Sequence, residues 1–417
     1  MGLAFIPLLA PARLKGFGSS KVEHLHTPVD PVSAQTEQIN ASLDAVRLEA
    51  FGGNEVERLK VRAAARRLLA RVETPYERAW GFCFEQPVVF AALQTCIDVG
   101  LWRSWTRLGG EKSIDELVKL TSPTVDTNLL PAFNVVEETA EDRFKPTPFS
   151  LSIGDESTKV RASLQAATNQ YIATSKNLPT YLASISYQEP QDVTTNNHSS
   201  SDPEGLNFFG RLQKTPAYYE AFTGHMEAWT TWKTPWTKVV DTNQLLAGAN
   251  LDSGSPFVVD VGGNTGIDIS HVLAKHPNIP VGSLVLQDLP EIIATAQVDK
   301  KITTMAHDFF LPQPVKAYFM HAVLHDWPDK KAKQLLENTK DAMTKGYSKL
   351  LVYDIVLPPT GASISQTTMD VQMMSLLSAS ERTQEQWNNL LTSTGFKIVK
   401  FWPDPQQYEM VIEAELA

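Results

Sequence analysis

Short apolar, β-branched stretches alternate with helical patterns from residue 256 onward. They are FVVDV (257–261), SLVLQ (283–287), ITTMA (302–306), KAYFMH (316–321), KLLVYDIV (349–356), KIVKFW (397–402) and YEMVIEAE (408–415). Strands that alternate with helices predict a mostly parallel sheet with helices on both faces, which is the α/β class. The last two stretches have no helical pattern between them, so we expect an antiparallel hairpin at the edge of the sheet.

The N-terminal half of the chain has a helical pattern instead. Apolar residues recur at helical spacing over residues 36–73, Pro75 ends that run, and Thr74 is placed to cap the next helix. A further helix is expected near residues 87–99, ending at Gly100. This half is therefore predicted to be mostly helical.

A winged-helix-like order of elements follows. Ser113 and Glu116 have the spacing of a capping box, and residues 133–150 indicate a small β-hairpin. This module has few Lys and Arg residues, so we expect it to pack against other parts of the protein and not to contact DNA. Residues 155–187 predict helix, and the polar residues 188–206 predict a surface loop.

Aromatic residues gather in the helical stretch 207–247, and methionines gather around residue 370. Such residues at helical spacing are most often plain core, but pockets for small apolar ligands are lined in the same way. We therefore expect a substrate pocket for a flat apolar acceptor, lined by Phe222, Met226, Trp229, Trp232, Met369 and Met373.

Composition and charge narrow the possible functions. The 417 residues are 42% hydrophobic and 20% charged, which is typical of a globular protein, and the formal net charge is −10. An acidic balance disfavours nucleic acid and anionic membranes as partners. The two cysteines, Cys83 and Cys96, predict small buried residues and no disulfide scaffold or metal site. The N-terminal apolar run is broken by Pro7, so we interpret it as a tail and expect no signal peptide and no membrane span.

A glycine-rich turn follows the first predicted strand, in VVDVGGNTG (258–266). Without a Cβ atom, glycine lets the backbone curl closely around a ligand, and the amides of the next helix point outward. The dinucleotide fingerprint G-x-G-x-x-G does not fit, because Asn264 and Ile267 stand at its second and third glycine positions when Gly262 is the first. NAD is therefore disfavoured.

Two carboxylates follow at the tips of the next predicted strands. Asp288 ends the second strand and is placed to accept both hydroxyls of a ribose. Asp308, after the third strand, is placed to reach an adenine amino group, with Phe309 packing on the ring. An acidic residue at a strand end is more often a cap or turn residue, but together with the glycine turn these two indicate a nucleoside cofactor.

His325 lies just beyond the fourth predicted strand, on the same rim. This is where a general base is expected. His321 competes for that role, but it lies inside the predicted strand. Asp354 at the end of the fifth strand and Glu381 before a helix could each hold a neutral imidazole in one tautomer, although helix capping or a solvated strand end would explain them equally well.

The motifs VVDVGGNTG, LVLQDLPEII, HDFF, LHDWPD, ERTQEQW and GFKIV occur in this order. From about residue 75 the chain resembles the plant- and fungal-type small-molecule O-methyltransferases, the caffeic-acid-methyltransferase-like group of class I S-adenosylmethionine-dependent enzymes. The resemblance implies a Rossmann-like seven-stranded sheet, His325 as the base and Asp354 and Glu381 beside it. It implies that the cofactor contacts Gly262, Gly263, Gly266, Asp288, Leu289, Asp308, Phe309 and His321. Relatives usually carry Lys or Arg at the position of His321.

The resemblance also implies an organisation of the chain. We expect an irregular tail over 1–35, a helical winged-helix-like dimerisation domain over 36–155, a helical linker with the substrate pocket over 156–250, and an S-adenosylmethionine-binding catalytic domain over 251–417. We expect a cytoplasmic homodimer that acts on a small aromatic or polyketide-like molecule, without a metal.

Two alternatives remain open beside O-methylation of a small, phenolic metabolite. Some fungal relatives keep the cofactor as an electrostatic element and catalyse dehydration or pericyclic ring formation, but their base position tends to carry Arg or Lys, whereas His325 stands here. A non-catalytic cofactor-binding subunit is the other alternative, and His325, Asp354 and Glu381 argue against it. A nucleic-acid methyltransferase is disfavoured by the acidic charge.

Overall fold

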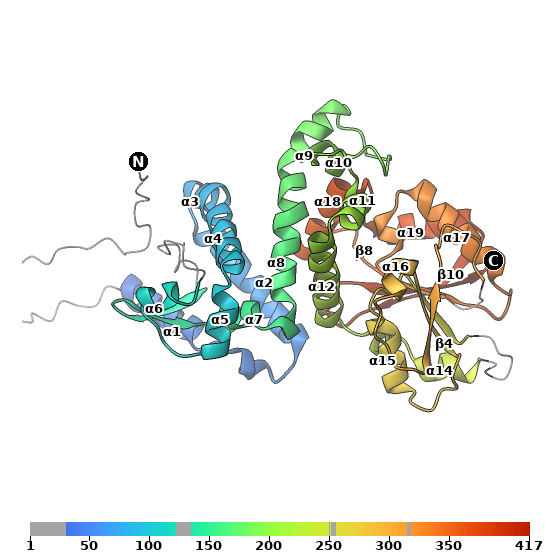
Figure 1. Cartoon of the computed structure of the whole chain (residues 1–417), viewed down its shortest axis with the longest axis horizontal. Coiled ribbons are helices and arrows are strands. Elements are labelled where there is room, and N and C mark those ends of the chain that lie inside the picture. The colour runs from blue at the N-terminus through green and yellow to red at the C-terminus, as the bar shows by residue number, and fades with distance from the viewer. Residues whose placement is uncertain (1–30, 122–134, 250, 252–255, 315–317) are drawn as a thin grey trace, which may run out of the picture.

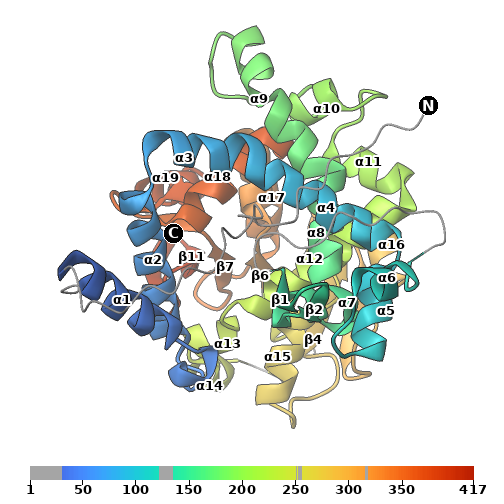
Figure 2. The ribbon, with the colours of Figure 1, turned by 90° about the vertical axis from the view of Figure 1, so that its left-hand side faces the viewer.

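Helices form the N-terminal part of the protein. The computed structural model describes residues 31–121, 135–249, 251, 256–314 and 318–417. The first helices are α1 (Pro31–Asp44), α2 (Glu55–Val72), α3 (Pro75–Trp80), α4 (Gln86–Asp98), α5 (Leu101–Leu108), α6 (Ile114–Val118) and α7 (Pro148–Gly154). Strands β1 (Val136–Ala140) and β2 (Arg143–Pro146) form an antiparallel hairpin. Figure 1 shows these elements together at one end of the molecule, and Figure 2 views them from outside.

Capping explains where several of these helices begin and end. Thr74 and Glu77 form a capping box at the start of α3, and Ser113 and Glu116 form the predicted one at α6. Gly100, at a φ of 75°, separates α4 from α5. These predictions and that of the hairpin are confirmed.

Other predictions for this region need correction. The helical stretch expected over 36–73 is divided into α1 and α2, because the turn between them contains two glycines with positive φ. Residues 31–35 are helical and not irregular, whereas residues 1–30 of the expected tail and 122–134 lie outside the described residues. Cys96 is buried, but Cys83 is exposed, on a π-helical turn whose neighbours are exposed as well.

A second group of helices joins this region to the sheet: α8 (Val160–Ala166), α9 (Ile172–Ser184), α10 (Asn197–Ser201), α11 (Phe208–Lys214), α12 (Pro216–Trp232), α13 (Trp236–Val239) and α14 (Thr242–Ala247). In Figure 1, α8 and α12 lie side by side between the N-terminal helices and the sheet. They place the aromatic residues of α12 against the rim of the sheet.

Residues 188–206 are not simply the surface loop that their polarity predicted. They contain α10, and Asn196, Asn197 and His198 are buried. The Nδ2 of Asn197 donates to the carbonyl of Thr174 at 2.9 Å and to that of Ser375 at 3.0 Å. The amides are buried because they donate to backbone carbonyls of α9 and α18, a function that polarity alone does not reveal.

Seven strands form the main sheet, as predicted. They are β3 (Val258–Val261), β4 (Leu284–Asp288), β5 (Ile302–Ala306), β6 (Tyr318–His321), β7 (Leu350–Asp354), β10 (Phe396–Pro403) and β11 (Met410–Leu416), in the order β10-β11-β7-β6-β3-β4-β5. Neighbouring strands from β7 to β5 are parallel, and β11 pairs antiparallel with both β7 and β10. A short parallel pair joins β8 (Val356–Leu357) to β9 (Arg382–Thr383).

Helices cover both faces of this sheet. They include α15 (Ile267–Lys275), α16 (Pro290–Ile293), α17 (Asp329–Ala342) and α19 (Gln384–Ser393), whereas α18 (Ile364–Leu377) packs on α9 and α10. One buried cluster joins strand residues to Leu335 of α17 and Trp387 of α19, and another joins them to Trp236 of α13 and Ile269 of α15. The α/β prediction is confirmed. Ligands in such sheets bind beyond the carboxyl ends of the strands, where the strand order reverses, which is here between β3 and β6.

No single helix among the described residues is long and apolar enough to cross a membrane. The bent pair Pro75–Asp98 and Leu101–Leu108, with 70° between its parts, passes that test of length and composition only when the two are taken together.

Candidate active site

The glycine turn connects β3 to α15, with Gly262 at a φ of 70° and Gly266 at a φ of 80°. A Cβ atom on Gly263 would lie 2.5 Å from Leu286 Cδ1 and 2.6 Å from Asp260 Cγ. Glycine is therefore required at position 263 partly for packing within the protein, because the turn lies against side chains of β3 and β4. Gly262 lies beside the ring of Phe309, which brings two predicted cofactor contacts together.

Asp288 is tied to this turn. Its Oδ2 accepts a hydrogen bond from the backbone N–H of Asn264 at 2.8 Å, and its Oδ1 accepts one from the N–H of Leu289 at 2.7 Å. Burial raises the pKa of the Asp288 carboxyl. Each oxygen keeps a second lone pair, so the carboxylate can still accept hydrogen bonds from ribose hydroxyls. Asp308 accepts from the N–H of Phe310 at 2.9 Å through Oδ1.

His325 is buried and lies among three carboxylates. We call these four side chains the His325 cluster: His325, Asp326, Asp354 and Glu381. Its Nδ1 lies 2.8 Å from Glu381 Oε1 and 3.4 Å from Asp354 Oδ1, whereas its Nε2 lies 3.4 Å from Asp326 Oδ1. Burial alone would lower the pKa of His325, but the carboxylates of Asp354 and Glu381 outweigh it and raise the pKa to about 10.

The carboxylates of the cluster come from separate elements. Asp354 ends β7, and burial raises its pKa to about 6. The backbone N–H of Glu381 donates to Asp370 of α18 at 2.9 Å, which fixes the segment between α18 and β9. His325, Asp354 and Glu381 offer ligand atoms within 4.8 Å of one another, so the expectation of no metal stays a prediction.

Arg382 holds the loop that carries His325, a role that no local pattern indicates. Its guanidinium is buried and donates to the carbonyls of Leu324 at 3.0 Å and Trp327 at 2.8 Å, and it pairs with Asp329. Because Arg382 follows Glu381 directly, one short segment places the carboxylate and fixes the loop opposite it.

His321 ends β6 and belongs to a second group, which we call the Lys233 cluster: Lys233, Asp268, His321 and Glu409. Its Nδ1 lies 2.6 Å from Asp268 Oδ2 and its Nε2 lies 3.0 Å from Lys233 Nζ. Burial and Lys233 lower the pKa of His321, but Asp268 and Glu409 outweigh them and raise the pKa to about 9.

Lys233, Asp268 and Glu409 were missed by sequence reasoning. Lys233 caps α12, and its ammonium pairs with Glu409, which directly precedes β11. Burial lowers the pKa of Lys233 to about 8. Helical spacing could have indicated Lys233. It shares one face of α12 with Phe222, Met226 and Trp229, which were predicted to line the pocket.

The predicted pocket residues lie in three places. Phe222, Met369 and Met373 meet in one apolar cluster beside Phe208 of α11. The Trp229 ring stacks on both histidines, with ring centroids 5.8 Å from His321 and 6.2 Å from His325. Met226 is half-buried between them on α12. Trp232 instead packs edge-on against Tyr408 and is 37% exposed.

The comparison with known proteins connects this rim to a reaction. Residues 226–397 match the model of the O-methyltransferase domain. The chain is 43% identical over 385 residues to the O-methyltransferase ATR12 of Stachybotrys chlorohalonatus, with 90% of this chain and 97% of that protein covered. The chain belongs to the S-adenosylmethionine-dependent O-methyltransferases.

A second relative agrees with this assignment, and a solved structure agrees with the fold. The O-methyltransferase mfmE of Annulohypoxylon moriforme is 34% identical, with 92% of this chain and 96% of that protein covered. The solved structure of the LepI complex with SAM has a TM-score of 0.79 at 24% identity and covers 93% of this chain and 99% of its own, a likeness of fold.

The donor set of the rim fits the cofactor of this O-methyltransferase. Asp288 and Asp308 stand beyond neighbouring strands, and the ring of Phe309 lies beside Gly262. Asp260 Oδ2 and Glu409 Oε2 are buried without a hydrogen-bond partner among the described residues. The hydroxyl and amino groups of a nucleoside can donate to Asp288 and Asp308. The ammonium of an attached amino acid can donate to the buried oxygens of Asp260 and Glu409.

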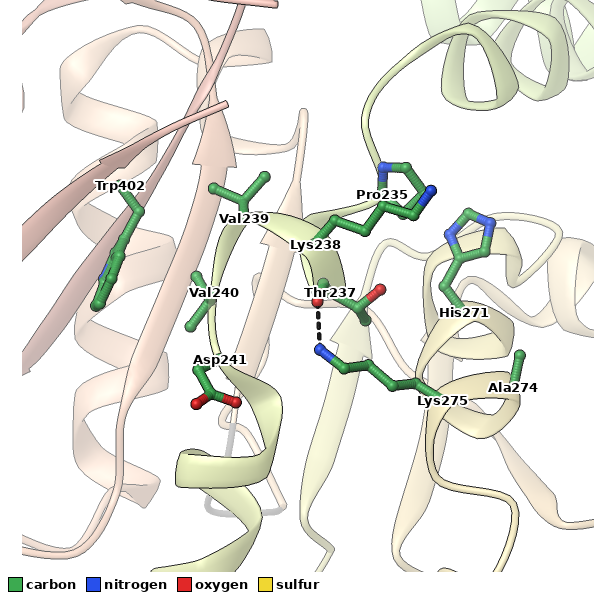
Figure 3. A pocket seen from close by; sticks show the side chains of 10 residues that line it. All are labelled: Pro235, Thr237, Lys238, Val239, Val240, Asp241, His271, Ala274, Lys275 and Trp402. Atoms are coloured by element: carbon green, nitrogen blue, oxygen red, sulfur yellow. Dashed lines mark hydrogen bonds between the residues drawn. The ribbon is translucent and has the colours of Figure 1, made fainter. Parts of the chain in front are cut away.

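A surface hollow of about 920 Å³ lies elsewhere on the O-methyltransferase. Figure 3 shows it between the segment from Pro235 to Asp241, one side of α15 and Trp402 of β10, with Lys275 Nζ donating to the carbonyl of Thr237. None of the predicted site residues lines it.

Proposed function

We propose that His325 is the general base of an O-methyltransferase that acts on a phenolic hydroxyl of a small secondary metabolite. The observation that carries the proposal is the asymmetry of its ring. Glu381 holds Nδ1 at 2.8 Å, which fixes the proton there and leaves the lone pair on Nε2 for the acceptor hydroxyl. Asp354 and Glu381 then stabilise the imidazolium that forms.

S-adenosylmethionine supplies an electrophilic methyl group on a sulfonium. His325 takes the hydroxyl proton at Nε2, and the carboxylates that raise its pKa stabilise the imidazolium that results. A phenol, with a pKa near 10 as in tyrosine, gives up this proton more readily than an aliphatic hydroxyl, which is closer to water with a pKa of about 15.7. This difference in acidity favours a phenolic acceptor.

Apolar side chains support a flat acceptor beside His325. Trp229 stacks on the imidazole, and Phe222, Met369 and Met373 form an apolar wall between α12 and α18. Their polarizable and aromatic groups suit a small aromatic or polyketide-like molecule. We propose Trp232 as a neighbour of this pocket rather than part of its wall, because it packs on Tyr408.

For the cofactor we propose contacts at the glycine turn and at the next two strand tips. Asp288 would hold the ribose, and Asp308 with Phe309 would hold the adenine. Gly262, Gly263, Gly266, Leu289 and His321 complete the proposed set.

A panel of phenols incubated with S-adenosylmethionine tests the function through release of S-adenosylhomocysteine. We expect methylated product and S-adenosylhomocysteine in equal amounts, and their loss in His325→Gln. Turnover that survives in His325→Gln would refute the base. A ring-forming or dehydrating enzyme would instead convert its substrate without releasing S-adenosylhomocysteine.

We propose a homodimer through α3 and α4, with domain boundaries near residues 156 and 251. Tyr76, Trp80, Phe82, Phe84 and Val88 are 43–71% exposed, and such an apolar surface is typical of an interface. Light scattering should give twice the chain mass, and Trp80→Glu with Phe84→Glu should halve the measured mass.

We also propose a cytoplasmic location, which the two free thiols suit.

A further inference from the structure

The Lys233 cluster is an unusual group to find inside a protein. The side chains of Lys233 and Glu409 are 2% and 0% exposed, and those of His321 and Asp268 are 6% and 10% exposed. A buried ion pair is weak support for stability, because apolar residues of similar size often do as well. Two acids and two bases buried together at a ligand-binding rim therefore call for a functional reason.

The position of the cluster along the rim suggests what it contacts. Asp308 follows β5, Asp288 ends β4, the glycine turn follows β3 and His321 ends β6, and these four strands are neighbours in that order. If the nucleoside lies over β5 and β4, the rest of the cofactor continues toward β6. Asp268 lies in the first turn of α15 directly after the glycine turn. The cluster thus lies where the end opposite the adenine must lie.

The cluster and the neighbouring strand residue Asp260 have unmet bonding capacity. Glu409 Oε2 in the cluster and Asp260 Oδ2 beside it are buried and have no hydrogen-bond partner among the described residues. His321 Nε2 lies 3.5 Å from Glu409 Oε2. Lys233 Nζ and His321 Nε2 are 3.0 Å apart, so they either share one proton or repel each other as cations. A carboxylate against both nitrogens would relieve the repulsion, and an ammonium would supply donors to the two oxygens.

We propose that the Lys233 cluster binds the amino acid end of S-adenosylmethionine, with Lys233 and His321 facing its carboxylate and Asp268 and Glu409 facing its ammonium. Trp229 connects this site to the reaction, since its ring lies under Lys233 Nζ and stacks on both His321 and His325. The inference rests on the cofactor assignment and not on the identity of the acceptor.

The test compares two ligands that share an adenosine. S-adenosylhomocysteine has the amino acid end, and 5′-methylthioadenosine lacks it. The variant Lys233→Met with Glu409→Gln removes both charges, so that neither is left buried alone. By calorimetry we expect its affinity for S-adenosylhomocysteine to fall about 10- to 100-fold, the range of a charged hydrogen bond. We expect its affinity for 5′-methylthioadenosine to stay within about twofold.

The control is Lys349→Met with Glu413→Gln, which removes an ion pair whose lysine is 43% exposed. This pair lies where β7 begins, at the end of the strand opposite Asp354, and its loss should leave both affinities unchanged. Equal losses for the two ligands in the Lys233 variant, or no loss for either, would overturn the proposal. If the double variant does not fold, Lys233→Arg keeps the charge but moves it, and must weaken S-adenosylhomocysteine more than 5′-methylthioadenosine. A wild-type protein that binds S-adenosylhomocysteine but methylates no phenol would refute the proposed function and leave this site intact.

Discussion

Two histidines four residues apart face different surroundings at the rim of the same sheet. His321 in the Lys233 cluster has a charged partner on each ring nitrogen, Asp268 at 2.6 Å and Lys233 at 3.0 Å. Among the described residues, His325 has a short contact at Nδ1, with Glu381 at 2.8 Å, and a longer one at Nε2, with Asp326 at 3.4 Å. A histidine with a close charged partner on each nitrogen is fixed in place for binding, whereas one with a distant partner on one nitrogen can exchange a proton there. The partners, and not the residue type, separate the two roles.

The largest effect should come from exchanging each histidine for glutamine. His325→Gln removes the base, so turnover should fall about 10²- to 10⁴-fold while S-adenosylhomocysteine binds as before. His321→Gln should weaken S-adenosylhomocysteine but leave most of the turnover at saturating cofactor. Steady-state kinetics and calorimetry on both variants check this. The reverse pattern would mean that the two roles are exchanged.

Lys233→Met alone should cost stability. It leaves the carboxylate of Glu409 buried without its cation, and breaking a buried pair in this way costs about 3–5 kcal/mol. Urea unfolding should show this loss, and adding Glu409→Gln should restore much of it. A single variant as stable as the wild type would show that Glu409 is protonated or solvated without Lys233.

The pH dependence of kcat/KM should follow the His325 cluster. His325 accepts a proton only when neutral, so kcat/KM should rise with pH toward the pKa of about 10. Glu381→Gln removes one charge that raises this pKa, so the rise should move to lower pH by about 1–3 units. Asp354→Asn should act in the same direction. A shift to higher pH would contradict the geometry.

The smallest effect concerns the tryptophan between the clusters. Trp229→Leu should lower both cofactor affinity and turnover, each by a few fold, because the ring stacks on both histidines. Trp232→Leu is the matched control and should leave both within about twofold, since that ring packs on Tyr408. Similar losses in the two variants would indicate a general loss of packing on α12.

Strand tips were the most predictable part of the site. Short apolar, β-branched runs predicted all seven strands, and parallel strands bring their carboxyl ends to one edge, so Asp288, His325 and Asp354 had to share a rim. The local pattern carries this information because the side chains lie next to the strands that place them.

Long-range charge pairing was not predictable. Lys233 meets Glu409 across 176 positions, and no local pattern links a helix cap to the residue before the last strand. Asn197 was predicted in a surface loop for the same reason, because its amide bonds carbonyls of distant helices. A prediction from sequence places polar residues at the surface, because most of them are exposed in folded proteins. Only the fold shows which of them have buried partners.

The position of β11 has a consequence for the order of biosynthesis. It is the last of the seven strands in the chain, yet it pairs between β10 and β7. Glu409 enters with it, 176 residues after Lys233, which at about 5–20 residues per second is a delay of roughly 10–35 s on the ribosome. Completion of the sheet and neutralisation of the Lys233 cluster are therefore one late event, long after α1–α7 have emerged and are free to fold.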